Sequence, residues 1–185
     1  MKTLIFLTFS LGLAVAHAAD PKTVRAPLLN ATDREPAPVF RLMNAEGKPV
    51  SIAAYRGKVM LLDFWATECG GCKVEIPWFM EIAEAYNGKA LAVVGVSMDI
   101  LYEGLKGASE GWNKVKPFVR EHKVNYPILM GDDLVTKQYD VQALPATYLI
   151  DRKGRVAATY IGVVNKDDVE AHIKALLLEP SSGIL

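Results

Sequence analysis

The chain has 185 residues, with 21 basic and 21 acidic residues and a formal net charge of zero. This length suits a single domain with its own core, and about half of the residues are apolar, as in an ordinary globular protein. A balanced charge without long blocks of one sign gives no reason to expect nucleic acid or an acidic surface as a partner. Composition and charge therefore favour one globular domain and argue against a nucleic-acid-binding protein.

The first residues have the pattern of a secretory signal peptide. Lys2 gives a positive start, an apolar run covers residues 4–15, and a small-x-small sequence follows at 16–18. The apolar run has about a dozen residues, whereas a helix that spans a bilayer needs ~20. We predict a cleaved signal peptide at 1–18 and a periplasmic or otherwise extracytoplasmic protein. The alternative is an uncleaved N-terminal segment that tethers the chain.

Three segments are predicted between the signal peptide and the first helix. Residues 19–36 are polar and contain prolines, which predicts a flexible leader before a domain that covers residues 37–180. Two short β-like runs around a glycine turn predict a hairpin at 38–52. The apolar run 58–66 predicts a strand that is buried on both faces.

The rest of the chain alternates between helical and strand-like segments. Helices are predicted at 71–88, 111–122, 132–141 and 165–179, strands at 90–98 and 125–130, and a second hairpin at 146–162. On the first helix the apolar residues Val74, Trp78, Ile82 and Tyr86 recur at helical spacing. The connection 99–113 is long, and we expect either a partner-recognition loop or a small extra helix there. The order predicts an α/β fold with a central mixed sheet and helices on both faces.

The only two cysteines, Cys69 and Cys72, form the sequence CGGC after the predicted buried strand. As a structural disulfide they would close a very short loop and stabilise the protein little. Zinc needs more ligands, and His122 and His172 lie far from the pair along the sequence. The remaining interpretation is a dithiol that is reversibly oxidised.

The two cysteines have different expected environments. Cys69 opens a helix, where free N–H groups and the helix dipole stabilise a thiolate and lower its pKa below the ordinary ~8.5. Cys72 lies one turn deeper on the same face. We therefore expect Cys69 to attack a target disulfide and Cys72 to resolve the mixed disulfide that forms.

The residues around this pair resemble a known family. The stretch VMLLDFWATECGGCKVEIP is similar to the active site of the thioredoxin superfamily. Together with PVFRLMNAEGKPVSI, VVGVSMD and ALPATYLIDRKGRV, over about residues 36–178, it resembles the TlpA/ResA-like extracytoplasmic thiol–disulfide oxidoreductases, which are associated with cytochrome c maturation. The resemblance implies a thioredoxin-like fold with an N-terminal β-hairpin, and an enzyme that reduces disulfides in exported proteins.

The resemblance also implies the partners of the chain. Its substrates would be exported proteins that carry disulfides or thiols, and its electron donor would be a membrane thiol reductant. The cysteines themselves carry the electrons, so we expect neither a dissociable cofactor nor a metal. We further expect a monomer.

Two prolines acquire roles from the resemblance. The family kinks its active-site helix at the position of Pro77, which explains a proline inside a helix that would otherwise be costly. The resemblance also implies a cis bond between Leu144 and Pro145, with Pro145 packed beside the disulfide. The backbone N–H and C=O of Leu144 would then pair with the substrate chain.

Two carboxylates are candidate site residues. On spacing alone, Glu75 would be a solvated residue of a helix face, but the resemblance implies that it tunes the cysteines. Asp63 lies in the predicted buried strand, where a charge is expensive, and the resemblance implies that it relays a proton to and from Cys72. Either acid, when it is ionised nearby, would raise the pKa of a thiol.

The residues beside the cysteines complete the predicted site. Trp65 is expected to pack against the active-site loop and, with Gly70, Gly71 and Leu144, to meet the substrate. Thioredoxin-like sites often have tryptophan where this chain has Glu68, and proline where it has Gly71. These departures mean that the sequence does not determine the reduction potential.

Three other functions share parts of this pattern. A peroxiredoxin-type antioxidant needs threonine or serine three residues before its cysteine, where this chain has Ala66 before Cys69. A copper-handling protein uses C-x-x-x-C with a histidine, and the spacing here is different. A disulfide-donating oxidase would use the same cysteines in the opposite direction, so only its potential distinguishes it.

Overall fold

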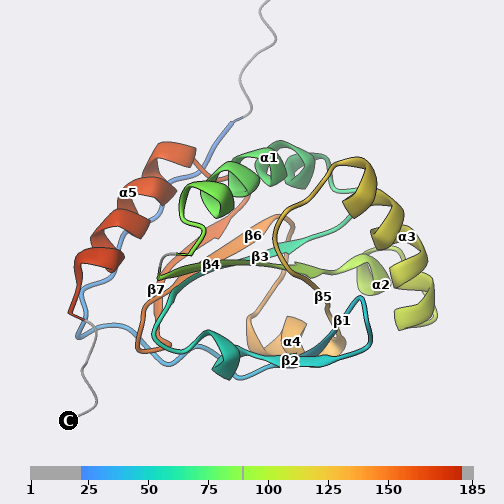
Figure 1. Cartoon of the computed structure of the whole chain (residues 1–185), viewed down its shortest axis with the longest axis horizontal. Coiled ribbons are helices and arrows are strands. Elements are labelled where there is room, and N and C mark those ends of the chain that lie inside the picture. The colour runs from blue at the N-terminus through green and yellow to red at the C-terminus, as the bar shows by residue number, and fades with distance from the viewer. Residues whose placement is uncertain (1–21, 89, 181–185) are drawn as a thin grey trace, which may run out of the picture.

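The computed structural model describes residues 22–88 and 90–180, which form one mixed sheet between two layers of helices (Figure 1). The strands are β1 (Arg41–Asn44), β2 (Pro49–Ser51), β3 (Val59–Trp65), β4 (Leu91–Ser97), β5 (Ile128–Met130), β6 (Ala146–Ile150) and β7 (Val156–Ile161). The helices are η1 (Ile52–Tyr55), α1 (Gly70–Ala85), α2 (Asp99–Tyr102), α3 (Ala108–Glu121), α4 (Asp133–Gln138) and α5 (Lys166–Leu178). The predicted signal peptide at 1–18 lies outside the described residues.

The strands of the described residues form a seven-stranded sheet in the order β2-β1-β5-β4-β3-β6-β7. Neighbours β3 and β4, and β4 and β5, are parallel, whereas the other pairs are antiparallel. Both predicted hairpins are confirmed, as β1–β2 and β6–β7. The predicted mixed α/β architecture is therefore correct.

Strand β3 lies near the middle of the sheet, and all of its residues are buried, as its apolar run predicts. Its side chains alternate between the two faces. Leu61 and Trp65 belong to a core cluster with buried residues of α1, α3 and α5, whereas Leu62 and Phe64 belong to a second cluster with Val135 of α4. Figure 1 shows α1 and α5 on one side of the sheet and α4 on the other.

The apolar periodicity of α1 predicts a helix but does not identify its fully buried side. Of the four residues at helical spacing only Ile82 is fully buried, whereas the buried residues are Cys72, Glu75, Ile76, Phe79 and Ile82. A helix turns once in 3.6 residues, so a strict spacing of four drifts around the axis while alternating steps of three and four stay on one side. The buried side of α1 includes Glu75, which a pattern made only of apolar residues does not predict.

The flexible leader is also wrong for residues 22–36, which are held along the domain. The backbone N–H of Val24 donates to Val163 O at 2.7 Å, and that of Leu29 donates to Ala157 O at 2.9 Å. Arg34 is buried and donates to Asp151 Oδ2 at 3.1 Å. Half-buried apolar side chains at alternate positions of this segment (Val24, Ala26 and Leu28) pack against the core. Because polar residues alternate with these apolar side chains, the sequence pattern did not predict that this segment packs on the domain.

The long connection 99–113 contains the short helix α2 and the first turns of α3. Of the two expected alternatives, a small extra helix is thus present. Trp112 is partly buried against the core. No helix in the described part of the chain is both long and apolar enough to cross a membrane.

Arg34 offers a test of how the N-terminal segment is held. Its guanidinium, with a side chain only 2% exposed, pairs with the equally buried Asp151 and with Glu179. We expect Arg34→Ala to lower the free energy of unfolding in urea by about 1.5–3 kcal/mol, because the buried Asp151 loses one of its two cation partners and keeps only Arg155. Arg25, whose side chain is 64% exposed in its pair with Asp168, is the control, and Arg25→Ala should cost less than about 1 kcal/mol. Equal costs for the two variants would contradict the prediction.

Candidate active site

The two cysteines lie where the sequence predicts, between the end of β3 and the start of α1. Cys69 is the N-cap residue of α1, and its Sγ accepts from the backbone N–H of Cys72 at 3.2 Å. The two sulfurs are joined in a disulfide with an S–S distance of 2.06 Å. Cys69 is 4% exposed and Cys72 is 1% exposed. The residue predicted to attack is thus the more accessible of the two, at a helix terminus that favours a thiolate.

The bond between Leu144 and Pro145 is cis, which confirms the expectation from the resemblance. Pro145 lies against the turn of the cysteines: a Cβ added to Gly71 would lie 3.1 Å from Pro145 Cδ and 2.9 Å from Val163 Cγ2. A Cβ added to Gly70 would meet nothing within 4 Å. Gly71 is therefore required by close packing, whereas Gly70 lies in an exposed and open position.

Asp99 holds the loop that leads to Cys69, a role that was not predicted from the sequence. Its buried carboxylate accepts from Thr67 N at 3.1 Å, from Thr67 Oγ1 at 2.5 Å and from Ser97 Oγ at 2.8 Å. These bonds connect the loop after β3 to the end of β4. The available signal was an aspartate at the end of VVGVSMD, where the predicted buried strand stops.

The predicted carboxylates Asp63, on β3, and Glu75, one turn after Cys72 on α1, are both buried, at 1% and 0% exposure. Glu75 Oε1 accepts from the backbone N–H of Val164 at 2.5 Å. Among the described residues, both oxygens of Asp63 and the Oε2 of Glu75 have no hydrogen-bond partner. The solvated position that spacing alone favoured for Glu75 is therefore wrong, because the helix turns this residue toward the sheet.

Burial changes the protonation of this pair of acids. Desolvation raises the pKa of Asp63 to about 8. Desolvation, followed by the charge of Asp63, raises the pKa of Glu75 to about 9, and the Val164 N–H acts in the opposite direction. At neutral pH both carboxyl groups are therefore mainly protonated.

Two aromatic residues, Trp65 and Tyr126, lie near these acids. Gly95 pairs with Asp63 across β3 and β4, and a Cβ on Gly95 would lie 2.9 Å from Trp65 Nε1 and 3.2 Å from Tyr126 Cε2. Burial, and then the charges of Asp63 and Glu75, raise the pKa of the Tyr126 hydroxyl. No sequence signal pointed to Tyr126. Trp65 is completely buried in a core cluster that also contains Cys69 and Cys72, and its contact with the substrate stays a prediction.

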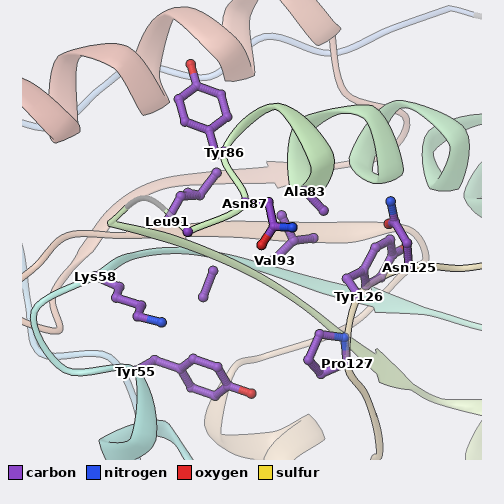
Figure 2. A pocket seen from close by; sticks show the side chains of 12 residues that line it. Tyr55, Lys58, Ala83, Tyr86, Asn87, Leu91, Val93, Asn125, Tyr126 and Pro127 are labelled. Carbon is purple, nitrogen blue, oxygen red and sulfur yellow. The ribbon is translucent and has the colours of Figure 1, made fainter.

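A pocket of about 360 Å³ lies near the C-terminal end of α1, away from the cysteines at its start. Figure 2 shows Tyr55 and Lys58 on one side of it and Asn125, Tyr126 and Pro127 on the other. Its lining contains no sulfur nucleophile. Within the described ranges, no group of three histidine, cysteine or acidic side chains is placed to hold a metal ion.

A smaller hollow of about 280 Å³ borders the cis-proline loop. It is lined by Met98, Leu101, Tyr102, Thr136, Val141, Gln142, Ala143 and Leu144. Leu101 and Tyr102, from α2, are 41% and 53% exposed. Apolar side chains at this exposure, next to Leu144, form an accessible surface that adjoins cis-Pro145.

A buried strand that delivers C-x-x-C to a helix N-terminus, a cis-proline against that turn and buried acids on the same strand and helix define a thioredoxin-like thiol–disulfide oxidoreductase. The chain belongs to the AhpC/TSA family, whose model matches residues 34–159.

Similar proteins agree with this assignment. The thiol-disulfide oxidoreductase ResA of Geobacillus thermodenitrificans is 30% identical over 141 residues, which cover 76% of this chain and 75% of the relative. The thioredoxin-like protein YneN of Bacillus subtilis is 31% identical over 134 residues, which cover 72% and 74%. A solved thiol:disulfide interchange protein of the thioredoxin family from Chlorobium tepidum is similar with a TM-score of 0.66 and 25% identity, over 78% of this chain and 97% of that chain.

The two glycines between the cysteines provide a matched test of close packing. Gly71→Ala should lower the free energy of unfolding of the oxidised protein by about 1–3 kcal/mol, because the new methyl group overlaps the ring of Pro145 and the side chain of Val163. Gly70→Ala should stay within ~0.5 kcal/mol of the parent. Urea denaturation measures both, and equal effects would show that Gly71 is not packed as described.

Asp63 should make stability depend on pH. Its pKa is raised from 3.8 to about 8 in the folded protein, so the folded state holds a proton that the unfolded chain releases. Stability is thus fully present below about pH 4 and is lost as the pH rises toward 8. Asp63→Asn should remove part of this loss, and at pH 8 it should be more stable than the parent by on the order of a few kcal/mol.

The control for this titration is Asp33→Asn. Asp33 is fully exposed and its pKa is lowered by Asn30 and Thr32, so it stays ionised from pH 5 to 8 and its replacement should leave the profile unchanged. Urea unfolding of the oxidised protein at pH 4 and pH 8 gives the comparison. A parent protein with the same stability at both values would show that Asp63 is not protonated in the fold.

Proposed function

We propose that this chain is an exported reductant of disulfides in extracytoplasmic proteins, and that Cys69 and Cys72 carry its electrons without a dissociable cofactor. The observation that carries the proposal is the Cys69–Cys72 disulfide at the start of α1, packed beside cis-Pro145. The relatives named as thiol-disulfide oxidoreductases support the same chemistry.

The reaction begins with the reduced pair. The Cys69 thiolate attacks one sulfur of the substrate disulfide, and the other substrate sulfur leaves as a thiolate that takes up a proton. The thiolate of Cys72 then attacks Cys69 in the mixed disulfide, which releases the second substrate thiol and forms the Cys69–Cys72 bond. Two electrons pass from the cysteines to the substrate.

The buried acids handle the proton of Cys72. The carboxylate form of Asp63, a minor fraction at neutral pH because burial raises its pKa to about 8, accepts this proton when Cys72 becomes a nucleophile. Because burial raises the pKa of Asp63 to about 8 and that of Glu75 to about 9, the acceptor is close in acidity to a thiol, at ~8.5. Proton transfer between them is then nearly balanced in either direction, as a reversible redox step requires.

The substrate is an unfolded or extended segment of another exported protein. Its backbone would pair with the N–H and C=O of Leu144, and an apolar side chain near its cysteine would fill the hollow beside Leu101 and Tyr102. We infer a monomer that receives electrons from a membrane thiol reductant and serves cytochrome c maturation, as the resemblance implies.

Two linked measurements test this function on the mature chain from residue 19. The midpoint potential of the Cys69–Cys72 couple should lie near ~−270 mV, the value of a reducing thioredoxin. The reduced Cys72→Ser variant should accumulate a mixed disulfide with a peptide disulfide substrate, since the resolving thiol is missing, whereas Cys69→Ser should form none.

Other outcomes would change the assignment. A potential near ~−120 mV would indicate an oxidase that donates disulfides. A mixed disulfide on Cys72 rather than Cys69 would reverse the roles of the cysteines. Consumption of hydrogen peroxide faster than reduction of the peptide would favour the peroxiredoxin alternative.

A further inference from the structure

The N-terminal residues 22–26 lie against the loop that follows β7. Val24 and Val164 form a parallel bridge, in which Val24 N donates to Val163 O at 2.7 Å and Asn165 N donates to Val24 O at 2.8 Å. A second anchor is Asp168, which accepts from the backbone N–H of Ala26 at 3.3 Å. We call residues 22–26 the strap.

The peptide group between Val163 and Val164 lies between the strap and the buried acids. Its carbonyl accepts from Val24 on one side, and its N–H donates to Glu75 Oε1 at 2.5 Å on the other. The C=O and N–H of a trans peptide point in opposite directions. The strap bond therefore determines the direction of the N–H that Glu75 receives, and it also polarises that donor.

The same loop contacts the cysteine turn directly. Val163 is the side chain that limits space at Gly71, and Gly162 N donates to Pro145 O at 2.8 Å. The strap thus stabilises a loop that touches the active site at three places: the buried glutamate, the glycine turn and the cis-proline.

The groups that could influence Glu75 come from several elements. Asp63 of β3 and Tyr126 before β5 interact with it inside the core, and the cysteine pair lies at the start of the same helix, α1. The charged groups of the strap and α5 that lie nearest interact with one another, since Asp168 pairs with Arg25 and lies beside His172. What reaches Glu75 from this side is the Val164 N–H, a donor that favours its ionised form.

We propose that the strap is a positioning element of the redox site, which acts on Glu75 through the peptide group of Val163 and Val164. This rests on the proton role proposed above for the buried Asp63–Glu75 pair. When the strap is detached, the donor loses its fixed direction and Glu75 becomes harder to ionise. Detachment of this segment then changes the proton-transfer step of disulfide exchange.

The test compares two proline variants of the full mature chain. Val24→Pro removes the backbone N–H that donates to Val163 O. Leu29→Pro removes the backbone N–H that donates to Ala157 O, near the start of β7 and away from the strap. The readout is the pKa of the Glu75 carboxyl group in the oxidised protein, from an NMR titration of its carboxyl carbon. We expect Val24→Pro to raise it by about 0.5–1 unit and Leu29→Pro to leave it unchanged.

The same titration remains informative if Val24→Pro folds poorly. Ala26→Pro removes only the anchor to Asp168 and should produce a smaller shift of the same sign. An unchanged Glu75 pKa in both strap variants, or the same shift in Leu29→Pro, would overturn the proposal.

A separate measurement distinguishes this idea from the proposed function. The pH profile of peptide-disulfide reduction should shift in Val24→Pro, and in a Glu75→Gln background the strap variant should add no further shift, because the two act on one group. A shifted Glu75 pKa without a shifted profile would leave the strap as a positioning element and contradict the proton role of the buried pair.

Discussion

Strand β3 cannot move without exposing a continuous apolar surface, because all seven of its residues are buried between two layers. The redox site is built on the end of this strand. The loop after it is held to β4 by the buried Asp99, and the next residues open α1. Packing on both faces of one strand therefore determines where Cys69 stands, and the helix terminus then supplies the electrostatic environment of its thiolate.

The two buried acids of β3 and α1 lower the stability of the fold and also suit the proposed proton transfer. Asp63 and Glu75 occupy positions in a core where an ionised carboxylate is poorly solvated, so they retain protons well above their usual range. That destabilises the fold as the pH rises. It also brings their acidity close to that of a thiol, which an exposed carboxylate could not achieve.

The rest of the site is assembled from segments that are distant in sequence. The loop at 162–165 contacts Gly71, the cis-proline and Glu75, and the residues that hold this loop in place come from the opposite end of the domain. A glycine between the cysteines is required because the rings and methyl groups of this loop and of Pro145 leave no room for a side chain. The active site is thus closed by long-range packing as much as by the local CGGC turn.

Local sequence patterns predicted much of the secondary structure and the position of the cysteines. The apolar run of β3, the two hairpins, the N-cap Asn165 of α5 and the position of the cysteines at a helix start follow from short-range periodicity and capping. The cis bond before Pro145 was accessible only through resemblance to a family, because an isolated X-Pro sequence favours trans.

Tertiary packing determined the burial and the neighbours of several residues, which no local sequence pattern predicts. It turned Glu75 into the core, buried Trp65, brought Tyr126 beside the acids and packed residues 22–36 along β7. Each of these outcomes depends on which distant segment fills the neighbouring space, so the same residue could be solvated or buried without any change in its own sequence neighbours. The chemistry of the cysteines can be inferred from the sequence, whereas the environment that tunes them exists only in the folded protein.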